Sequence, residues 1–592
     1  MRWRRSRPER ASRRRDGAPR PRKTLAVPLV SALLALGLLA LAVRPSAGAR
    51  PVAFVNGQVL TMDAADRRFE ALLVEEGRIA ALGTSREILA RRPPGARVVD
   101  LAGGTLLPGF VDAHGHFPSS GIGAEGIDLA PPPSGDVADP ETLLVRVARA
   151  ARSTAGQGWL LGFDYDNTAF ADGRHPTRAA LDRVSGDHPV FLRHRSGHMG
   201  VANSRALAEL GLDEGAEPVP GGWLGRDADG RLDGLLQERS APSLARLLRQ
   251  VPPWRLVAIL ARARDEYLGV GVTTVQSGAA SGRLVRALRL ARRAGLFPQR
   301  IVVWPLDEAY GDVSDDGTGE RAGGASGGEP GLVVGAVKLF ADGSPQGLTA
   351  HLSEPYDASS GAPPGHVGHA ALTVEALHER IAFHHAAGHQ LAIHGNGDAA
   401  IEAIIEGVAA AQRAHPRDDP RHVLVHAQTI RRDQLARLAA LGITPSFFVA
   451  HTWYWGDWHR LRGLGAARAA TISPTGWARD LGVRYTLHAD APVTPMAPMQ
   501  LLWSATERRT AGGHLLGPDQ RVSRLEALRA LTVDAAWQAR LEDSLGSLEP
   551  GKLADLALLS GDPLTVPDVR ELEVLGTWIG GIERYRRDAR ED

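Results

Sequence analysis

The chain has 592 residues, with 69 Lys plus Arg against 67 Asp plus Glu, and it contains no cysteine. The absence of cysteine excludes disulfides, thiolate metal ligands and a cysteine nucleophile, and 43% hydrophobic with 23% charged residues is a globular composition, not a disordered or coiled-coil one. Residues 1–49 carry 12 basic and 2 acidic groups, so the remainder, with 57 and 65, is net acidic. That balance argues against nucleic-acid binding.

The first 49 residues predict an export leader. An Arg-rich segment, residues 1–23, precedes an uncharged apolar run at residues 25–43, and such a positive flank keeps the N-terminus cytoplasmic while the following chain is exported. The run of 19 residues is long enough to span a bilayer. Ala47-Gly48-Ala49, however, is typical of a signal-peptidase site. Two interpretations stay open: anchoring in the membrane by residues 25–43, or release after cleavage near Ala49.

Short strand-like runs follow near both ends of the remaining chain. Residues 52–55 and 58–62 flank Asn56-Gly57, a dipeptide typical of a β-hairpin turn. Residues 552–559 and 573–579 show similar runs. We therefore expect the two end segments to form one composite β-sandwich domain. Its segments are residues 50–107 and 541–592.

The middle of the chain, residues 108–540, alternates apolar runs with helical patterns. Helices are expected where apolar residues recur at spacings of three and four, at residues 374–387, 399–415 and 432–441. Strands are expected to end near residues 116, 276, 304, 340, 394, 426, 448 and 488. Eight such strands predict an α/β fold, a (β/α)8 TIM-like barrel with its site at the C-terminal strand ends. An insertion after barrel strand 1, at about residues 120–265, is expected to lie over the barrel mouth.

Candidate ligand histidines close three of the expected strands. His114 and His116 are two residues apart at the end of strand one, so both side chains point to one face and can reach one metal ion. Such a pair alone is equally compatible with chance or a structural role. His394 and His426 end the fifth and sixth strands. A single histidine there is more often structural, but two at equivalent positions on neighbouring strands favour coordination.

Two further residues complete the candidate site. Lys338 is one of only three lysines and lies in an apolar strand, where an ammonium group is costly to bury. A buried amine can lose its charge and react with CO2, and the resulting carbamate can bridge two divalent ions; an ion-paired or snorkelling lysine is the alternative. Asp490 follows the eighth strand. A carboxylate facing an activated water can take its proton and pass it to a leaving amine.

This ordered set resembles the amidohydrolase superfamily, and more narrowly its family 3 branch of YtcJ-like and N-substituted formamide deformylase-like proteins. Residues 271–274, 342–344 and 546–555 also look like that branch, and the resemblance extends from about residue 51 onward. The chain departs from the pattern at Val425, where the family often has an acidic residue. It departs again at His488-Ala489, where Ser or Gly often precedes the aspartate.

The resemblance implies a metal-dependent hydrolase of a non-peptide C–N bond, in an amide, an N-substituted formamide or a similar group. It implies one or two divalent metal ions, with zinc expected. On this basis His114 and His116 hold one ion, a carbamate on Lys338 bridges, and His394 and His426 hold the second. Asp490 would bind metal and act as general base. The alignment also suggests His198 as a substrate contact, although the Asp frequently found two residues before that histidine is Ser196 here.

The segment at residues 447–459 is unusually aromatic for a chain with 5% aromatic residues. At a barrel mouth it would form a pocket wall for an apolar or aromatic N-substituent, with His451 and Trp455 as substrate contacts. Packing against the inserted segment is equally compatible. We expect a small-molecule substrate, no nucleic acid, membrane contact only through the N-terminal segment, and a homodimer as one possible assembly.

Three competing functions remain open from the sequence. The same site could hydrolyse an ester or a lactone. The chain could be a non-catalytic exported binding protein on this scaffold, a function disfavoured by the presence of all six candidate ligands. It could also be a membrane-tethered interaction module, which predicts no bound metal and no turnover that depends on Asp490.

Overall fold

The structure, a computed structural model, describes residues 50–587 except 124, 155, 157, 220, 248–252, 315–319 and 322–330. The predicted leader at residues 1–49 lies outside the described residues, in both of its interpretations. Within the described ranges, no helix combines the length and the apolar character needed to cross a bilayer.

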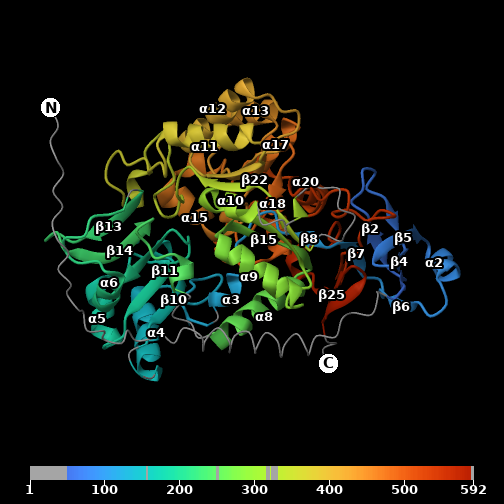
Figure 1. Cartoon of the computed structure of the whole chain (residues 1–592), viewed down its shortest axis with the longest axis horizontal. Coiled ribbons are helices and arrows are strands. Elements are labelled where there is room, and N and C mark those ends of the chain that lie inside the picture. Colours follow the sequence, from blue (N-terminus) through green and yellow to red (C-terminus); the bar gives the residue numbers. More distant parts are fainter. Residues whose placement is uncertain are drawn as a thin grey trace, which may run out of the picture. The chain divides into compact units, whose positions relative to one another are not determined.

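Two sheets gather strands from both ends of the described chain (Figure 1). The first has the order β5-β4-β1-β6, with β1 (Val52–Val55), β4 (Ala71–Glu75), β5 (Arg78–Gly83) and β6 (Arg97–Asp100). The second has the order β26-β25-β24-β7-β2-β3, with β2 (Gln58–Leu60), β3 (Arg68–Phe69), β7 (Thr105–Pro108), β24 (Leu556–Leu559), β25 (Val574–Ile579) and β26 (Ile582–Arg586). Both sheets contribute to one apolar core, in which the Phe54 ring meets the Trp578 ring edge-on at 5.1 Å.

The predicted hairpin across Asn56-Gly57 is wrong. β1 pairs with β4 and β6, whereas β2 pairs with β3 and β7, so the turn carries the chain from one sheet into the other. Asn56 does adopt the left-handed φ of 61° that the dipeptide favours. A Cβ at Gly57 would lie 2.5 Å from Leu101 Cβ, so glycine is needed here for close packing rather than for a hairpin.

Two parallel sheets of five strands each carry the central part of the chain. One has the order β17-β18-β16-β15-β8, with β8 (Phe110–Val111), β15 (Val272–Ala280), β16 (Arg300–Pro305), β17 (Glu320–Arg321) and β18 (Leu332–Val334). The other has the order β19-β20-β21-β22-β23, with β19 (Val337–Phe340), β20 (Leu391–Gly395), β21 (Val423–His426), β22 (Thr444–Phe447) and β23 (Thr486–Leu487).

These two sheets meet at one edge. A parallel bridge between Leu306 and Lys338 joins the end of β16 to β19. Each of the eight predicted strands has a counterpart in this series. Among the described residues, however, no strand ladder joins β23 to β8, so the backbone hydrogen bonds do not form the closed ring of the predicted barrel.

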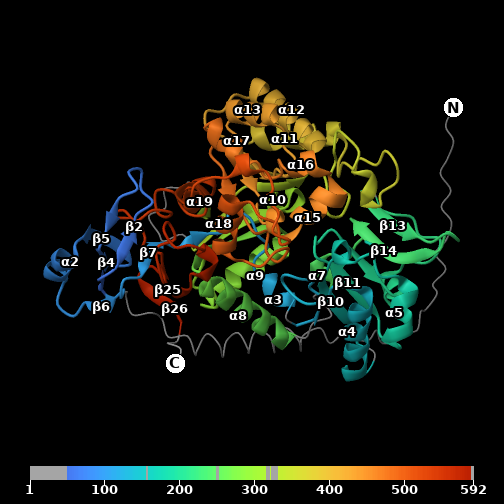
Figure 2. The ribbon, with the colours of Figure 1, turned by 180° about the vertical axis from the view of Figure 1, so that it is seen from behind.

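The helices between the parallel strands run along the outside of these sheets, and α11, α12 and α13 lie side by side in both views (Figures 1 and 2). They are α8 (Pro253–Gly269), α9 (Gly282–Arg293), α10 (Asp307–Ser314), α11 (Val374–Ala386), α12 (Asp398–Ala414) and α13 (Arg432–Leu441). After β22 come α14 (His451–Tyr454), α15 (Gly456–Trp458), α16 (Ala466–Ala469) and α17 (Thr475–Asp480), followed later by α18 (Pro498–Glu507), α19 (Arg524–Ala530) and α20 (Val533–Gln538). The helix α13 ends at Gly442, whose φ of 66° suits a residue without a Cβ.

The segment between β8 and α8 builds a further sheet with the order β13-β14-β12-β11-β10-β9. Its strands are β9 (Ile127–Asp128), β10 (Leu160–Tyr165), β11 (Val190–His194), β12 (Met199–Ala202), β13 (Gly222–Arg226) and β14 (Leu232–Glu238). The main helices that accompany it are α4 (Pro140–Ser153), α5 (Arg178–Ser185) and α6 (Ser204–Leu210). We call this part, residues 120–247, the inserted segment.

A buried ion pair links the parallel sheet that contains β16 to the sheet that contains β24, which we call the terminal sheet. Arg300 on β16 donates from Nε and Nη2 to the two carboxylate oxygens of Asp555, at 2.7 and 2.9 Å, and the Gly580 N–H donates to the same carboxylate at 2.8 Å. Arg300 and Asp555 are both buried. A bidentate contact that also satisfies a backbone donor fixes how these two sheets meet.

We expect Asp555→Ala to lower the free energy of unfolding by about 3–5 kcal/mol, because it breaks a buried bidentate ion pair and removes the acceptor of the buried Gly580 N–H. Glu583→Ala on β26 is the matched control: it removes the partly exposed pairs with Arg97, at 3.0 Å, and Arg586, at 2.7 Å, and should cost less than about 1 kcal/mol. Urea unfolding of the two variants measures the difference. Equal midpoints would contradict the structural role of Asp555.

Candidate metal centre and active site

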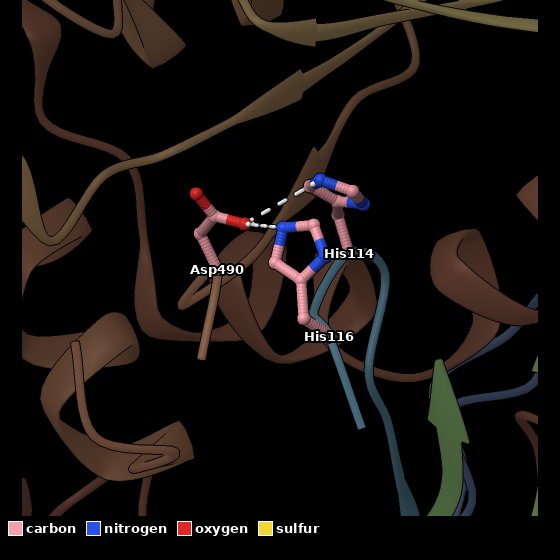
Figure 3. A group of neighbouring side chains, drawn as sticks. All are labelled: His114, His116 and Asp490. Atoms are coloured by element: carbon pink, nitrogen blue, oxygen red, sulfur yellow. Dashed lines mark ion pairs between the residues drawn. The ribbon is translucent and has the colours of Figure 1, made fainter. Parts of the chain in front are cut away.

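His114, His116 and Asp490 meet at the C-terminal ends of the parallel strands (Figure 3). Asp490 Oδ1 lies 3.1 Å from His116 Nε2 and 3.4 Å from His114 Nε2. Two donors bound tetrahedrally to one ion at 2.0–2.1 Å are separated by about 3.3 Å. The three side chains therefore have the spacing of ligands that share an ion.

The other ring nitrogens of these histidines are already occupied. His114 Nδ1–H donates to Gln276 Oε1 at 2.8 Å, and His116 Nδ1–H donates to the Gly278 carbonyl, also at 2.8 Å. Each ring therefore keeps its lone pair on Nε2, facing the Asp490 carboxylate. Lone pairs and a carboxylate oxygen that converge at this distance repel one another unless a cation lies between them, so the residues fit a divalent metal ion.

The backbone around the site is shaped for this close approach. A Cβ at Gly278 would lie 2.5 Å from His114 Cε1, so only glycine allows the ring to pack there. The His114 ring is stacked on Trp304 at 5.3 Å between ring centroids. His426 and Asp490 have φ values of 78° and 52°, a region that non-glycine residues rarely adopt and that is concentrated at functional sites.

Lys338 and the two remaining histidines complete the group. Lys338 on β19 is buried, and its Nζ lies 3.2 Å from His114 Nε2. Among the described residues, no carboxylate forms an ion pair with it. His394 Nε2–H donates to the Gly343 carbonyl at 2.9 Å, which leaves the Nδ1 lone pair 3.1 Å from His426 Nε2. The structure thus brings all six predicted ligands to the same strand ends.

The ionisation of these groups follows from their burial. Burial lowers the pKa of Lys338 to about 7, so much of this amine is neutral near neutral pH. Burial, followed by the charges of neighbouring groups, lowers the pKa values of His394 and His426 well below the usual range. Burial opposes ionisation of Asp490, but its basic neighbours outweigh burial and lower its pKa. The centre therefore combines the neutral imidazoles of His394 and His426 with an ionised carboxylate.

A small cavity adjoins the centre. Its walls include His198, His394, His426, His451 and Asp490, and it has room for about one water molecule. His198 Nδ1 lies 2.8 Å from Glu238 Oε2. Burial opposes a charge on His198, but Glu238 outweighs it and raises the pKa.

The profile of the amidohydrolase family matches residues 97–585. The chain belongs to the amidohydrolase family. The resemblance inferred from the sequence motifs is thereby confirmed, and this amidohydrolase is a hydrolase acting on carbon–nitrogen bonds.

Relatives match over nearly the whole chain. An N-substituted formamide deformylase from Arthrobacter pascens is 30% identical over 549 residues, 91% of this chain and 99% of the relative. The YtcJ protein of Bacillus subtilis (strain 168) is 28% identical over 548 residues, 90% and 99% of the two chains. A solved structure described as an uncharacterised metal-dependent hydrolase from Pyrococcus horikoshii OT3 has a TM-score of 0.67 and 26% identity, covering 88% of this chain and 99% of that one. The fold is accordingly an α/β fold of the TIM-barrel type.

His451 and Trp455, the two residues of the aromatic segment that were predicted to contact substrate, lie in different surroundings in this amidohydrolase. His451 lines the cavity. Trp455 is buried behind it, with its ring centroid 4.5 Å from that of His451, and its Nε1–H donates to Asp166 Oδ2 at 2.6 Å. Arg195, also from the inserted segment, lies over the Trp455 ring at 5.4 Å. Trp455 thus packs against the inserted segment and is not among the residues that line the cavity.

We expect Asp166→Ala to raise KM about tenfold while changing kcat much less. The substitution strands a buried indole N–H, at a cost of about 1–3 kcal/mol, and loosens the support of His451 without touching the reacting atoms. Asp172→Ala, an exposed aspartate in the same segment, is the matched control and should leave KM unchanged. Steady-state kinetics on any hydrolysed amide measures both; an unaltered KM in Asp166→Ala would contradict this role.

The supporting residues were missed by sequence reasoning. Gln276, Gly278, Glu238 and Asp166 hold ligands or pocket residues, but each lies on a different element from the side chain that it supports. The Gly271-Val272-Thr273-Thr274 motif at the start of β15 and the expected strand end near residue 276 indicated that strand, but neither indicated a contact with His114. Their roles depend on which strands become neighbours in the fold, and the order of the strands along the chain does not specify those neighbours.

Proposed function

We propose that this amidohydrolase hydrolyses a non-peptide C–N bond, in an amide, an N-substituted formamide or a similar group, using zinc. The proposal rests chiefly on one observation: the Nε2 atoms of His114 and His116 face Asp490 Oδ1 at 3.4 and 3.1 Å, and His394 Nδ1 faces His426 Nε2 at 3.1 Å. The formamide class is supported by the relative from Arthrobacter pascens, which carries that activity in its name. We also propose that eight strands of the two parallel sheets, namely β8, β15, β16 and β19 to β23, act as one barrel, with this site at its mouth.

In the proposed arrangement His114, His116 and Asp490 hold one ion, and His394 and His426 hold the second. Lys338 would bridge them as a carbamate, since its neutral amine faces His114 and reacts readily with CO2. Bound divalent ions polarise a scissile carbonyl and activate a water molecule for attack. Asp490 would take a proton from the attacking water and deliver it to the departing nitrogen.

On the other side of the cavity, His198 would face the substrate. Its Nδ1–H is held by Glu238, which fixes the ring so that Nε2 points away from the carboxylate. We propose that His198 contacts the carbonyl side of the substrate, and that His451 contacts the N-substituent. Both residues line the cavity that adjoins Asp490.

The test combines metal analysis of the purified protein with a panel of N-formyl amines, N-acyl amines, esters and lactones. We expect one or two zinc ions per chain and the highest kcat/KM on an N-formyl or N-acyl amine. A metal-free protein with full activity would refute the mechanism. A clear preference for esters or lactones would refute the proposed bond type, and no turnover on any member would favour a binding protein.

We propose that the body of the chain is exported, either anchored by residues 25–43 or released after cleavage near Ala49. The +10 charge of residues 1–49 ahead of a net acidic body supports this proposal. Cell fractionation with N-terminal sequencing of the isolated protein tests it. Cytoplasmic protein that retains residues 1–49 would contradict export.

A further inference from the structure

A buried series of hydrogen bonds runs from α20 to the metal-facing ring of His426. It crosses β22 and β23, and its members are 0 to 4% exposed, so water does not interrupt it. In order, it joins the Ala113 carbonyl, Gln538, Thr486, Ser446, His488 and His426.

The far end of the series sets its direction. A backbone carbonyl only accepts, so the Gln538 amide nitrogen must face Ala113 O, at 2.8 Å, and the amide oxygen then faces Thr486 Oγ1, at 2.8 Å. The amide oxygen also only accepts, so Thr486 gives it its one hydroxyl proton. Thr486 Oγ1 can therefore only accept from Ser446 Oγ, 2.8 Å away.

The same assignment of donors and acceptors extends from Ser446 through His488 to the ring of His426. Ser446 has given its proton to Thr486, so it accepts from His488 Nδ1–H at 2.9 Å. A neutral imidazole carries a single N–H, so the Nδ1–H of His488 leaves a lone pair on its Nε2. His426 Nδ1–H must donate to that lone pair, at 3.1 Å.

We propose that Gln538, Thr486, Ser446 and His488 are positioning residues that fix His426 in the tautomer with its proton on Nδ1 and its lone pair on Nε2. That lone pair faces His394 Nδ1 at 3.1 Å, where the proposed function places the second ion. The consequence for metal binding rests on the proposed function, but the tautomer itself does not.

The first experiment reads the tautomer in metal-free protein by two-bond 1H–15N correlations of 15N-labelled histidines, with His426→Asn used to assign the signal. In the wild type we expect a single Nδ1–H form of His426. In Ser446→Ala, His488 loses its acceptor and can reverse, so the single form should be lost and the Nε2–H form should appear. Ser504→Ala is the control, because it replaces an equally buried serine whose hydroxyl accepts from Gln500 Nε2 at 3.2 Å, outside this series.

Thr486→Val, which keeps the side-chain shape, gives an independent variant should Ser446→Ala fold poorly, and thermal unfolding checks each protein. An Nε2–H form in the wild type, or an unchanged single form in every folded variant, would overturn the inference.

The second experiment titrates zinc into the same metal-free proteins in competition with a chromogenic chelator. Loss of a group that orients a ligand typically weakens metal binding 10–100-fold. In Ser446→Ala we expect that loss for the ion proposed at His394 and His426, which has fewer protein ligands and is the weaker-bound ion. The ion proposed at His114, His116 and Asp490 should be unchanged, and Ser504→Ala should behave like the wild type. Equal affinities for the weaker ion despite a changed tautomer would overturn its link to binding. A wild type that shows the expected tautomer but binds one ion supports the inference and refutes the two-ion site instead.

Discussion

Asp490→Asn is expected to lower kcat by about 10³-fold or more. Asparagine has the shape of aspartate, so the fold is kept, but its amide cannot accept the proton of the attacking water, and general acid–base groups contribute about 10²–10⁴-fold to rate. The variant also replaces the carboxylate that faces His114 and His116 at 3.4 and 3.1 Å, so the ion proposed to lie between these three residues should bind less strongly. Steady-state kinetics with zinc content measured on the same samples tests both effects.

The matched control for this prediction is Asp534→Asn. Asp534 is also largely buried, with Arg484 at 3.2 Å, but it lies on α20 outside the group of ligands. Its kcat and metal content should equal those of the wild type. Activity of Asp490→Asn within twofold of wild type, at equal metal content, would refute the assigned role.

Lys338→Arg is expected to abolish the bridge and to reduce activity at least about 100-fold. Arginine keeps a positive charge at any physiological pH and its guanidinium does not form a carbamate. The substitution would place that charge against His114, whose Nε2 lies 3.2 Å from Lys338 Nζ. Both ions should then bind less tightly. Replacing a residue that merely contacts a metal ligand typically lowers metal affinity 10–100-fold, and Lys338 would itself be a ligand.

Lys552→Arg provides an unusually close control, because Lys552 is the only other lysine after residue 49. It pairs with Glu549 at 3.0 Å in a partly exposed position, where arginine serves equally well. Metal analysis, kinetics and intact-mass measurement under CO2 compare the two variants. A Lys338→Arg protein with two ions and full activity would refute the carbamate.

The parallel strands were predictable because each is a short apolar run that ends on a polar, chemistry-bearing residue. The predicted strand ends at His394 and His426 fall within one residue of the ends of β20 and β21, and the predicted helix at residues 432–441 has the bounds of α13. Burial on both faces makes such runs stand out in the sequence.

The pairing of strands was not predictable in the same way. Asn56-Gly57 has hairpin chemistry, yet β1 and β2 enter different sheets, since their partners come from distant segments. The contacts that support the metal ligands also depend on which distant segments of the chain become neighbours. Gln276 reaches His114 across 162 positions of the chain, and no local pattern indicates such a partner.

The terminal sheet has a consequence for the synthesis of the protein. β7 and β24 pair directly, with Leu107 opposite Ala557, so the ribosome must add about 450 residues before β7 acquires this neighbour. Pairing over such a separation carries a high loop-closure cost and is slow to form. Until then one side of β7 is an open strand edge that can recruit other chains. We therefore expect polypeptides that stop before β24 to aggregate even though every proposed metal ligand has already been made, which gives the last three strands a role in quality control of the nascent enzyme.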